Sequence, residues 1–328
     1  MFYPKVTVLI TTYNYDKFIG DAIDSILKQD YEINKIEIII IDDGSKDDTF
    51  IVVQEYIKIN NNIIYRYQQN KGKAAATKLG IKIASGKYLF NLDADDFFYY
   101  NCISTIVKFY ESDTSLVQVS HLANRIDGIN NAITPQINTH DLVNVPVNGF
   151  SFFQLMVFNN YNIGLGSTFS ARVSELKKIE INEDVDMYID LYLFIMLSRF
   201  GNVMQLDKIL SAFRRHEKSF SEGNTSSALK KQKVIRYSKS AKAVYFEIKN
   251  YYNSKKIILH YKYFYETHLL STAFFIKVNE YSIVFSLFNY TISSFWKYKR
   301  PFVFLKNSFK QICIFYANKA FNFISYKK

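Results

Sequence analysis

Residues 36–45 read IEIIIIDDGS, an almost wholly apolar run that ends in two aspartates, a glycine and a serine. An apolar run of this kind is typical of a strand that is buried on both faces of a parallel sheet. A second run, residues 6–10 (VTVLI), lies upstream and is followed by Thr-Thr-Tyr-Asn. Since one helix fits between the two runs, the pair predicts a β–α–β unit.

The segment between these runs has the periodicity of an amphipathic helix. Apolar residues recur at helical spacing over residues 16–29, which predicts a helix with one apolar stripe against the sheet. The alternation continues with a helix at 47–59, a strand at 63–67, a helix at 74–84 and a strand at 88–92. Farther along, the pattern loosens after Ser120, with a helix at 150–158, a strand near 167–170 and a helix at 190–200. The series predicts an α/β fold.

Polar clusters follow three of the predicted strands. They are residues 11–14 (TTYN), residues 42–45 (DDGS) and residues 93–96 (DADD). Because ligands of open α/β sheets bind outside the carboxyl ends of the strands, we expect the three clusters to meet in one crevice.

The last of these clusters brings three carboxylates together, those of Asp93, Asp95 and Asp96. Crowded carboxylates repel one another, and a divalent cation with oxygen ligands relieves the repulsion. Such an ion can hold the diphosphate of a nucleotide. An acidic turn or a helix N-cap accounts for the same residues without a ligand, so the cluster alone leaves both interpretations open.

The cluster at residues 42–45 also has two interpretations. Its carboxylates can accept hydrogen bonds from a base or a ribose, and Tyr13 can stack on the base. Alternatively it is a solvated loop in which Ser45 caps the next helix. The first predicted strand is not followed by G-x-G-x-x-G, and the sequence has no G-x-x-x-x-G-K-[ST] loop, which argues against dinucleotide and P-loop sites.

In this order the motifs resemble glycosyltransferase family 2, whose members have the GT-A fold. The matching stretches are VTVLITTYN (6–14), IIIIDDGSKDDT (38–49), NKG (70–72), SGKY (85–88) and NLDADDF (91–97). The resemblance covers residues 4–220 and implies a Rossmann-like mixed sheet flanked by helices that binds a nucleotide-diphospho-sugar.

The resemblance also implies roles for individual residues. Thr11, Tyr13 and Asp43 contact the nucleotide. Asp93 and Asp95 form the D-x-D pair, with Asp95 the direct ligand of Mn²⁺ or Mg²⁺ and Asp93 nearer the ribose and a metal-bound water.

The family's general base is an aspartate at the start of a helix, with a glycine about three turns farther on. Counting back from Gly201 gives Asp190 this place, although Ile189 stands where the family has glutamate. Two alternatives stay open: Asp190 only caps the helix, and Asp186 or Asp184 is the base.

Residues 210–216 (LSAFRRH) resemble the family strand that ends in Arg-His, which implies that His216 lies near the metal or the diphosphate. The helix after the third strand departs from the family, because Thr77-Lys78 replaces Arg-Asn. Lys73 or Lys78 can supply the missing cation, but a surface position is the more usual one for each lysine.

Positive charge is concentrated at the C-terminal end. Residues 221–328 hold 19 Lys and Arg against 4 Asp and Glu, a net +15, so residues 1–220 carry −4 of the total of +11. With residues 221–227 as a linker, we expect a catalytic domain at 1–220 and a basic, aromatic-rich helical extension at 221–328.

The extension has features of a membrane-surface element. Residues 281–296 are uncharged but fall short of the ~20 residues that span a bilayer. Farther on, an apolar helical face lies beside Lys306 and Lys310 and is made of Phe302, Leu305, Phe309, Ile312 and Tyr316. The alternative is an ordinary helical subdomain that packs on the catalytic domain or on a second subunit of an oligomer.

Cysteine usage and the first residues bear on location. Cys102 and Cys313 have no ligand spacing, which favours a reducing compartment, and residues 1–5 show no signal pattern. We therefore expect a cytoplasmic protein, peripheral on the inner face of the membrane.

The sequence thus predicts an inverting, metal-dependent glycosyltransferase. It would move a sugar from a nucleotide-diphosphate donor, with UDP favoured by the Asp43 match and GDP as the alternative, to a hydroxyl of a glycan or lipid-linked glycan in bacterial surface polysaccharide synthesis. One rival is a nucleotidyltransferase, which needs a Gly-rich loop after the first strand. Another is a non-enzymatic nucleic-acid binder, favoured by the basic, aromatic composition but opposed by the acidic strand ends, so no nucleic-acid partner is expected.

Overall fold

A computed structural model describes residues 3–127, 132–136, 141–159, 166–216 and 227–276. The chain forms two compact units, Met1–Asn224 and Thr225–Lys328. Most of the predicted linker and all of the predicted amphipathic face at 302–316 lie outside the described residues.

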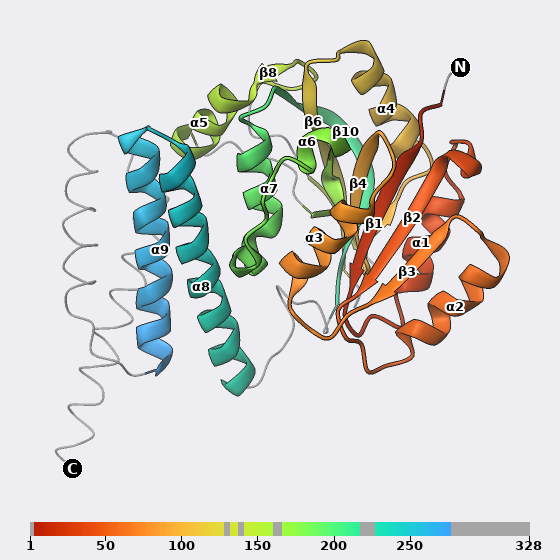
Figure 1. The fold of residues 1–328 in the computed structure, drawn as a ribbon, viewed down its shortest axis with the longest axis horizontal. Helices are drawn as coiled ribbons and strands as arrows, with labels where there is room; N and C mark the ends of the chain where they lie inside the picture. The colour runs from red at the N-terminus through yellow and green to blue at the C-terminus, as the bar shows by residue number, and fades with distance from the viewer. Residues whose placement is uncertain (1–2, 128–131, 137–140, 160–165, 217–226, 277–328) are drawn as a thin grey trace. The chain divides into compact units, whose positions relative to one another are not determined.

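A mixed sheet organises the first unit, with the described strands in the order β3-β2-β1-β4-β9-β6-β10-β5 (Figure 1). β1 is parallel to β2 and β4, and β2 is parallel to β3, whereas β9 is antiparallel to both β4 and β6. The strands of this path are β1 (Val6–Thr12), β2 (Ile36–Asp42), β3 (Ile63–Tyr67), β4 (Tyr88–Asp93), β5 (Phe97–Phe98), β6 (Leu116–Asp127), β9 (Phe169–Arg172) and β10 (Asn202–Arg215). Two short strands, β7 (Ile133–Pro135) and β8 (Val147–Asn148), pair with β6 and β10.

Helices cover both faces of the parallel part. Figure 1 shows α1 (Ile19–Leu27) and α2 (Thr49–Ile59) on one side of the sheet, and α3 (Lys73–Ile83) and α7 (Ile189–Leu197) on the other. The remaining helices of this unit are α4 (Cys102–Ser112), α5 (Gly149–Asn159), α6 (Val173–Leu176) and the 3₁₀ turns η1 (Ile33–Lys35), η2 (Gly166–Thr168) and η3 (Glu183–Tyr188).

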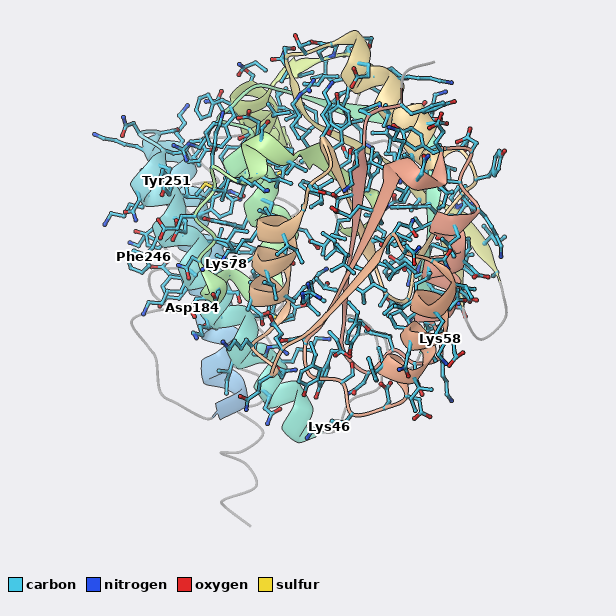
Figure 2. The ribbon with its side chains drawn as sticks, turned by 45° about the vertical axis from the view of Figure 1, so that its right-hand side comes forward. Lys46, Lys58, Lys78, Asp184, Phe246 and Tyr251 are labelled. Atoms are coloured by element: carbon cyan, nitrogen blue, oxygen red, sulfur yellow. The ribbon has the colours of Figure 1, made fainter. Side chains whose placement is uncertain are left out.

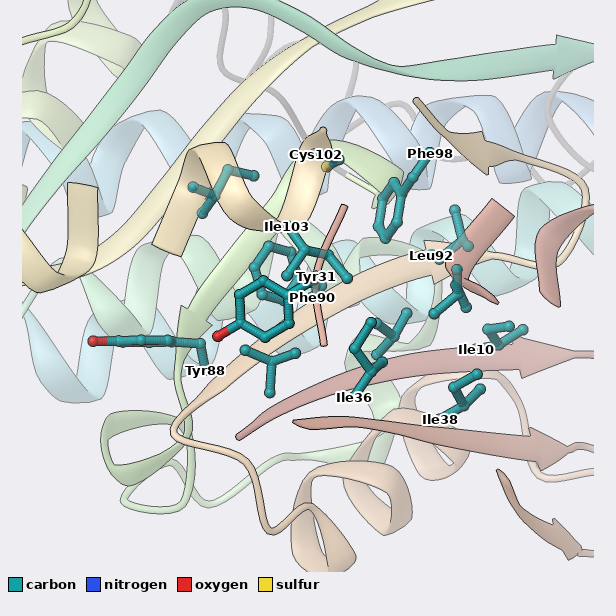
Figure 3. Close-up of a cluster of buried hydrophobic side chains, with 14 of the residues drawn as sticks. Ile10, Tyr31, Ile36, Ile38, Tyr88, Phe90, Leu92, Phe98, Cys102 and Ile103 are labelled. Atoms are coloured by element: carbon teal, nitrogen blue, oxygen red, sulfur yellow. The ribbon is translucent and has the colours of Figure 1, made fainter. Parts of the chain in front are cut away.

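A hydrophobic core cluster lies between the sheet and the layer of α1 and α4 (Figure 3). Alternate residues of β1, such as Val8 and Ile10, point into it and are fully buried. Burying one such side chain contributes about 1.5–3 kcal/mol relative to leaving it in water. On the opposite face, Leu9 contacts α3 at Gly80, where an added Cβ would overlap the leucine. The sheet is therefore held from both sides, which fixes the positions of its strand ends.

The strands expected at 6–10, 36–41, 63–67 and 88–92 are confirmed, and each helix expected between them is present. The first helix begins at Ile19 rather than at residue 16. The reason is local, because Asn14 has a positive φ of 61° and the backbone N–H of Asp16 donates to Asp47 Oδ2 at 3.1 Å. These contacts turn the chain away from the strand end before the helix starts.

The structure also contains elements that the sequence pattern did not reveal. α4 follows the D-x-D segment, and β6 runs to Asp127, well past Ser120, where the pattern was expected to loosen. β10 covers fourteen residues, Asn202–Arg215, and its C-terminal part contains most of the segment assigned by resemblance to a strand.

The second unit is helical in its described part. α8 (Ser227–Tyr251) and α9 (Lys255–Ile276) pack against each other, and Tyr245 stacks on Tyr265 with ring centroids 6.2 Å apart. Among the described residues, none of the helices is both long enough and apolar enough to cross a bilayer.

Candidate active site

The registers of β1, β2 and β4 bring the three polar clusters to one edge of the sheet. Thr11 lies opposite Asp93 of β4, and Thr12 lies opposite Asp42 of β2. The three clusters therefore lie together at the carboxyl ends of these strands, as expected. Tyr13, the next residue after β1, has 43% of its surface exposed and is available as a stacking platform.

Asp43 joins the segment after β2 to the segment before α3. Its Oδ1 accepts hydrogen bonds from Gln68 Nε2 at 2.7 Å and from the backbone N–H of Lys71 at 2.8 Å. Its Oδ2 accepts from the backbone N–H of Gly72 at 2.8 Å. An ionised carboxylate has about four acceptor positions, so these bonds leave one for a ligand.

Ser45 does not cap the next helix, so that interpretation of residues 42–45 is wrong. α2 begins at Thr49, whereas Ser45 Oγ accepts a hydrogen bond from the backbone N–H of Asn14 at 2.9 Å. Asp42 in turn accepts from the backbone N–H of Ser45 at 2.7 Å and from the hydroxyl of Tyr65 at 2.6 Å. Asp42 and Ser45 thus fix the loops after β1 and β2 to each other.

Asp96 anchors the acidic turn. Its carboxylate accepts hydrogen bonds from the hydroxyl of Ser167 and, at 3.0 Å, from the backbone N–H of Arg214. Burial, together with the neighbouring charges of Asp95 and Asp93, raises the pKa of Asp96 well above its ordinary value. The turn leads into β5, and α4 starts only at Cys102, so the N-cap interpretation of the cluster is wrong.

Asp95 contacts His216 across the site. The Nε2 atom of His216 lies 3.1 Å from Asp95 Oδ2, and about a tenth of each side chain is exposed. Phe18 stacks on the imidazole at a centroid distance of 4.1 Å, and Tyr15 meets it edge-on at 5.9 Å. These two aromatic rings, which the sequence motifs did not single out, hold the imidazole against the D-x-D segment.

The Asp95–His216 pair fits the expected divalent cation as part of its ligand set. Within the described ranges, no group of three or more His, Cys, Asp or Glu side chains is arranged to bind a metal ion. A carboxylate oxygen and an imidazole nitrogen are nevertheless suitable donors for a divalent ion. The other ligands would be water and the diphosphate of the donor, as is common for ions that bind nucleotides.

Lys73 connects the D-x-D segment to the predicted base. Its ammonium lies 2.8 Å from Asp93 Oδ1 and 3.3 Å from Asp190 Oδ2, and all three side chains are partly buried. Burial alone would lower the pKa of Lys73, but the charges of Asp190 and Asp93 outweigh it and raise that pKa. Burial raises the pKa of Asp190, Lys73 opposes that shift and Asp93 adds to it. The surface position expected for Lys73 is therefore wrong.

The three aspartates considered as base differ in position. Asp190 lies in the first turn of α7 and contacts Lys73, while the N-cap residue is Tyr188. Asp186 lies against the start of α3, next to Gly72. Asp184 is exposed in η3 (Figure 2). Of the three, Asp190 is thus the carboxylate placed beside the Lys73–Asp93 pair.

Lys78, one and a half turns along α3, has the surface position expected of a lysine (Figure 2). Its ammonium lies 3.1 Å from Glu183 Oε1, and nearly half of each side chain is exposed. Lys78 is therefore not held by the two carboxylates that contact Lys73.

Comparison with known proteins identifies the family. The family model for Glycosyl transferase family 2 matches residues 7–174, about half of the chain and all three strand-end clusters. The chain belongs to glycosyl transferase family 2. It is therefore a glycosyltransferase, and the interpretations as a nucleotidyltransferase or a non-enzymatic nucleic-acid binder are set aside.

Curated relatives of this family 2 glycosyltransferase differ in length. It is 28% identical over 320 residues to an uncharacterised glycosyltransferase of Haemophilus influenzae, covering 94% of this chain and 95% of that protein. It is also 28% identical to chondroitin synthase of Escherichia coli, over 63% of this chain but only 28% of the synthase. A minor teichoic acid biosynthesis protein of Bacillus subtilis is 31% identical over 34% of this chain and 13% of that protein. The family 2 domain is thus related to enzymes of polysaccharide and teichoic acid synthesis.

Solved structures confirm the GT-A fold expected from the sequence. TarS of S. aureus, in a structure with UDP-GlcNAc, has a TM-score of 0.54 at 17% identity, covering 85% of this chain and 83% of that one. A mannosyltransferase from Pyrobaculum calidifontis, in complex with GDP-Man and Mn²⁺, has a TM-score of 0.57 at 15% identity, covering 96% and 87%.

Proposed function

We propose that this family 2 glycosyltransferase is inverting and metal-dependent, with Asp190 as the general base and a nucleoside-diphosphate sugar as donor. The observation that carries the proposal is the Asp93–Lys73–Asp190 contact beside the Asp95–His216 pair. It brings a candidate base and a candidate metal site to the same edge of the sheet. A single carboxylate acting on the acceptor supports one displacement at the anomeric carbon, which inverts its configuration.

Each residue then has a defined task. Thr11, Tyr13 and Asp43 bind the nucleotide, and Asp93 lies on the ribose side. Asp190 accepts the proton of the acceptor hydroxyl, a contribution of typically ~10² to 10⁴-fold for a general base.

Asp95, His216 and Asp93 are the proposed residues for holding Mn²⁺ or Mg²⁺. The ion would neutralise the charge that develops on the departing nucleoside diphosphate. Asp96 keeps the turn in place through Ser167 and the backbone of Arg214.

We propose UDP as the carrier of the donor, with GDP as the alternative. Support comes from the Asp43 motif and from the UDP-GlcNAc bound to TarS, while the mannosyltransferase with GDP-Man supports the alternative. The relationship to chondroitin and teichoic acid enzymes supports a glycan or lipid-linked glycan acceptor in bacterial surface polysaccharide synthesis.

The C-terminal region has a separate proposed role. We assign catalysis to residues 1–220 and peripheral contact with the inner face of the cytoplasmic membrane to residues 221–328. The net charge of +15 on the latter supports attraction to anionic lipids.

A panel of nucleotide sugars, incubated with Mn²⁺ or Mg²⁺ and candidate acceptors, tests the mechanism. The readouts are nucleoside diphosphate release and donor binding by calorimetry. Wild-type protein should release one nucleoside diphosphate in a metal-dependent manner. Asp95→Ala should lose metal-dependent donor binding, whereas Asp190→Ala should bind donor normally and lose ~10² to 10⁴-fold in turnover.

Asp184→Asn is the matched control, since it removes an exposed carboxylate that was an alternative base. It should keep wild-type turnover. Loss of turnover in Asp184→Asn with full activity in Asp190→Ala would assign the base elsewhere. Absence of metal-dependent binding for every donor would overturn the proposed metal-dependent mechanism.

A further inference from the structure

We propose that Lys73 is a positioning residue that ties the Asp190 carboxylate to Asp93 at the end of β4. The proposal rests on the proposed function, in which Asp190 is the base. Lys73 would thereby fix the position of Asp190, which acts on the acceptor, relative to Asp93, which lies on the donor side. This arrangement would be in place before either substrate binds.

The contact geometry is that of a bridge between two distant parts of the chain. Lysine has three N–H donors, and here two carboxylates lie within 2.8 and 3.3 Å of the ammonium. Asp93 ends β4 and Asp190 lies in the first turn of α7, so one cation connects a strand end to a helix start. Without it, the two negative charges would repel each other and tend to move apart.

The backbone that carries Lys73 is held from two directions. Gly72, immediately before it, donates its N–H to Asp43 Oδ2 at 2.8 Å. Gly72 has a φ of 96°, and a Cβ added there would overlap the carboxylate of Asp186. The start of α3 is thus held between the loop after β2 and η3. This leaves the Cα and Cβ atoms of Lys73 little freedom to move.

A second glycine, Gly166, lies close to the two carboxylates of the bridge. Gly166 has a φ of 62°, and a Cβ added there would lie 3.1 Å from Asp93 Oδ2 and 3.9 Å from Asp190 Oδ2. The backbone therefore passes close to both carboxylates, and at Asp190 it approaches the same oxygen that Lys73 contacts. Lys73 and Gly166 together limit where the Asp190 carboxylate can lie.

A residue that positions a base is expected to affect kcat more than donor affinity. Misplacing a reacting group by about 1 Å can cost ~10²-fold in rate, even when binding is retained. Lys73→Met removes the charge but keeps most of the length of the side chain. Lys73→Arg keeps the charge with a different donor geometry, so it should restore part of the loss.

The kinetic experiment uses the full chain, with the nucleotide sugar that the wild type turns over. We expect Lys73→Met to lower kcat by about tenfold to a hundredfold, with the donor KM changed by less than about threefold. Lys73→Arg should recover part of kcat. Lys78→Met, which removes the exposed lysine paired with Glu183 on the same helix, should match the wild type.

A thermal-unfolding cycle provides a readout that is independent of turnover. The variants are Lys73→Met, Asp190→Asn and the double variant. Because Lys73→Met leaves two carboxylates without their cation, it should lower Tm by less when Asp190 is already asparagine. Additive shifts would show that the bridge does not form and would overturn the proposal.

The kinetic outcomes separate this proposal from the assignment of the base. If Asp190→Ala loses turnover but Lys73→Met keeps wild-type kcat, the positioning role alone is overturned. A rise in donor KM with unchanged kcat would make Lys73 a donor-binding residue instead, which also overturns it. If Asp190→Ala retains turnover, the base assignment fails and this proposal fails with it.

Discussion

His121 is a buried histidine far from the strand-end cluster in sequence. It lies on β6, and its Nε2 is 3.2 Å from the hydroxyl of Ser211 on β10. In the described part of the chain its Nδ1 has no hydrogen-bond partner. Burial lowers the pKa of His121 to about 3, so the imidazole is neutral in the folded protein.

This histidine predicts a loss of stability on mild acidification. The unfolded chain takes up a proton near the ordinary histidine pKa of about 6.5, whereas the folded chain does not until about pH 3. The stabilising contribution is therefore complete above pH 6.5 and falls by about 1.4 kcal/mol per pH unit below it. Urea unfolding of the wild type and of His121→Asn between pH 7.5 and 5 measures this loss of unfolding free energy.

The variant should show the shallower decline in unfolding free energy below pH 6.5. Carboxylates that titrate in the same range affect both proteins and cancel in the comparison. Parallel curves for the two proteins would show that His121 is not held neutral by the fold.

At the residue scale, the sequence predicted the positions of side chains that directly follow strands. It did not predict the position of a side chain whose partners are distant in the sequence. Asp93, Asp95 and Asp43 stand directly after apolar runs, so their meeting at one sheet edge could be anticipated. Lys73 could not be placed, because its partners Asp93 and Asp190 lie 20 and 117 residues away. A lysine at a helix start has no local pattern that distinguishes a bridge from a surface position.

At the scale of elements, the first four strands were predictable and β6 was not. The early strands are mostly apolar with isolated polar residues such as Glu37, whereas β6 buries Gln118, Ser120 and His121 within four residues. Two of these polar residues have partners on β10, since Ser120 donates to Gln205 at 2.5 Å and His121 contacts Ser211. Polar pairs between strands satisfy each other inside the sheet, but in the sequence they interrupt the apolar pattern.

The turn that precedes β4 requires a glycine, Gly86. A Cβ at Gly86 would lie 2.5 Å from both the backbone nitrogen of Thr7 and the carbonyl carbon of Val6. These atoms belong to β1 and cannot move without disturbing its pairing with β2 and β4. A glycine is thus needed at position 86, because the turn before β4 lies directly against the backbone of β1.

We expect Gly86→Ala to destabilise the protein by about 1–3 kcal/mol, as overpacking against fixed backbone does. Gly20→Ala is the matched control, since its Cβ would meet the hydroxyl of Tyr56 at 3.3 Å, at the far end of a side chain. Alanine also suits the helical position of Gly20 better than glycine does. Denaturant unfolding measures the stability of both variants. Equal losses of unfolding free energy would contradict the explanation by overlap with the backbone of β1.

At the scale of the whole molecule, the two regions of the chain differ in charge. Residues 1–220 carry −4 and residues 221–328 carry +15. A region with so many cations and aromatic residues is suited to an anionic surface, and the attraction should weaken as salt screens it.

The full chain should therefore sediment with vesicles that contain anionic lipid, and high salt should release it. Reversing Lys306 and Lys310 to glutamate should weaken this retention. The control reverses Lys28 and Lys58, two exposed lysines of the first unit, and changes the net charge equally. Equal weakening by both pairs, or equal binding to neutral vesicles, would contradict a specific role for the C-terminal region.

The register of β4 between its neighbours also limits how the length of this chain can vary during evolution. Tyr88 lies opposite Val6, and Asp93 lies opposite Thr11. Deleting one residue from β4 would shift Asp93 by about 3.3 Å and turn it to the other face of the sheet. Insertions and deletions that preserve activity should therefore fall between the strands and helices, so an alignment of active homologues should have no gaps within β1 or β4.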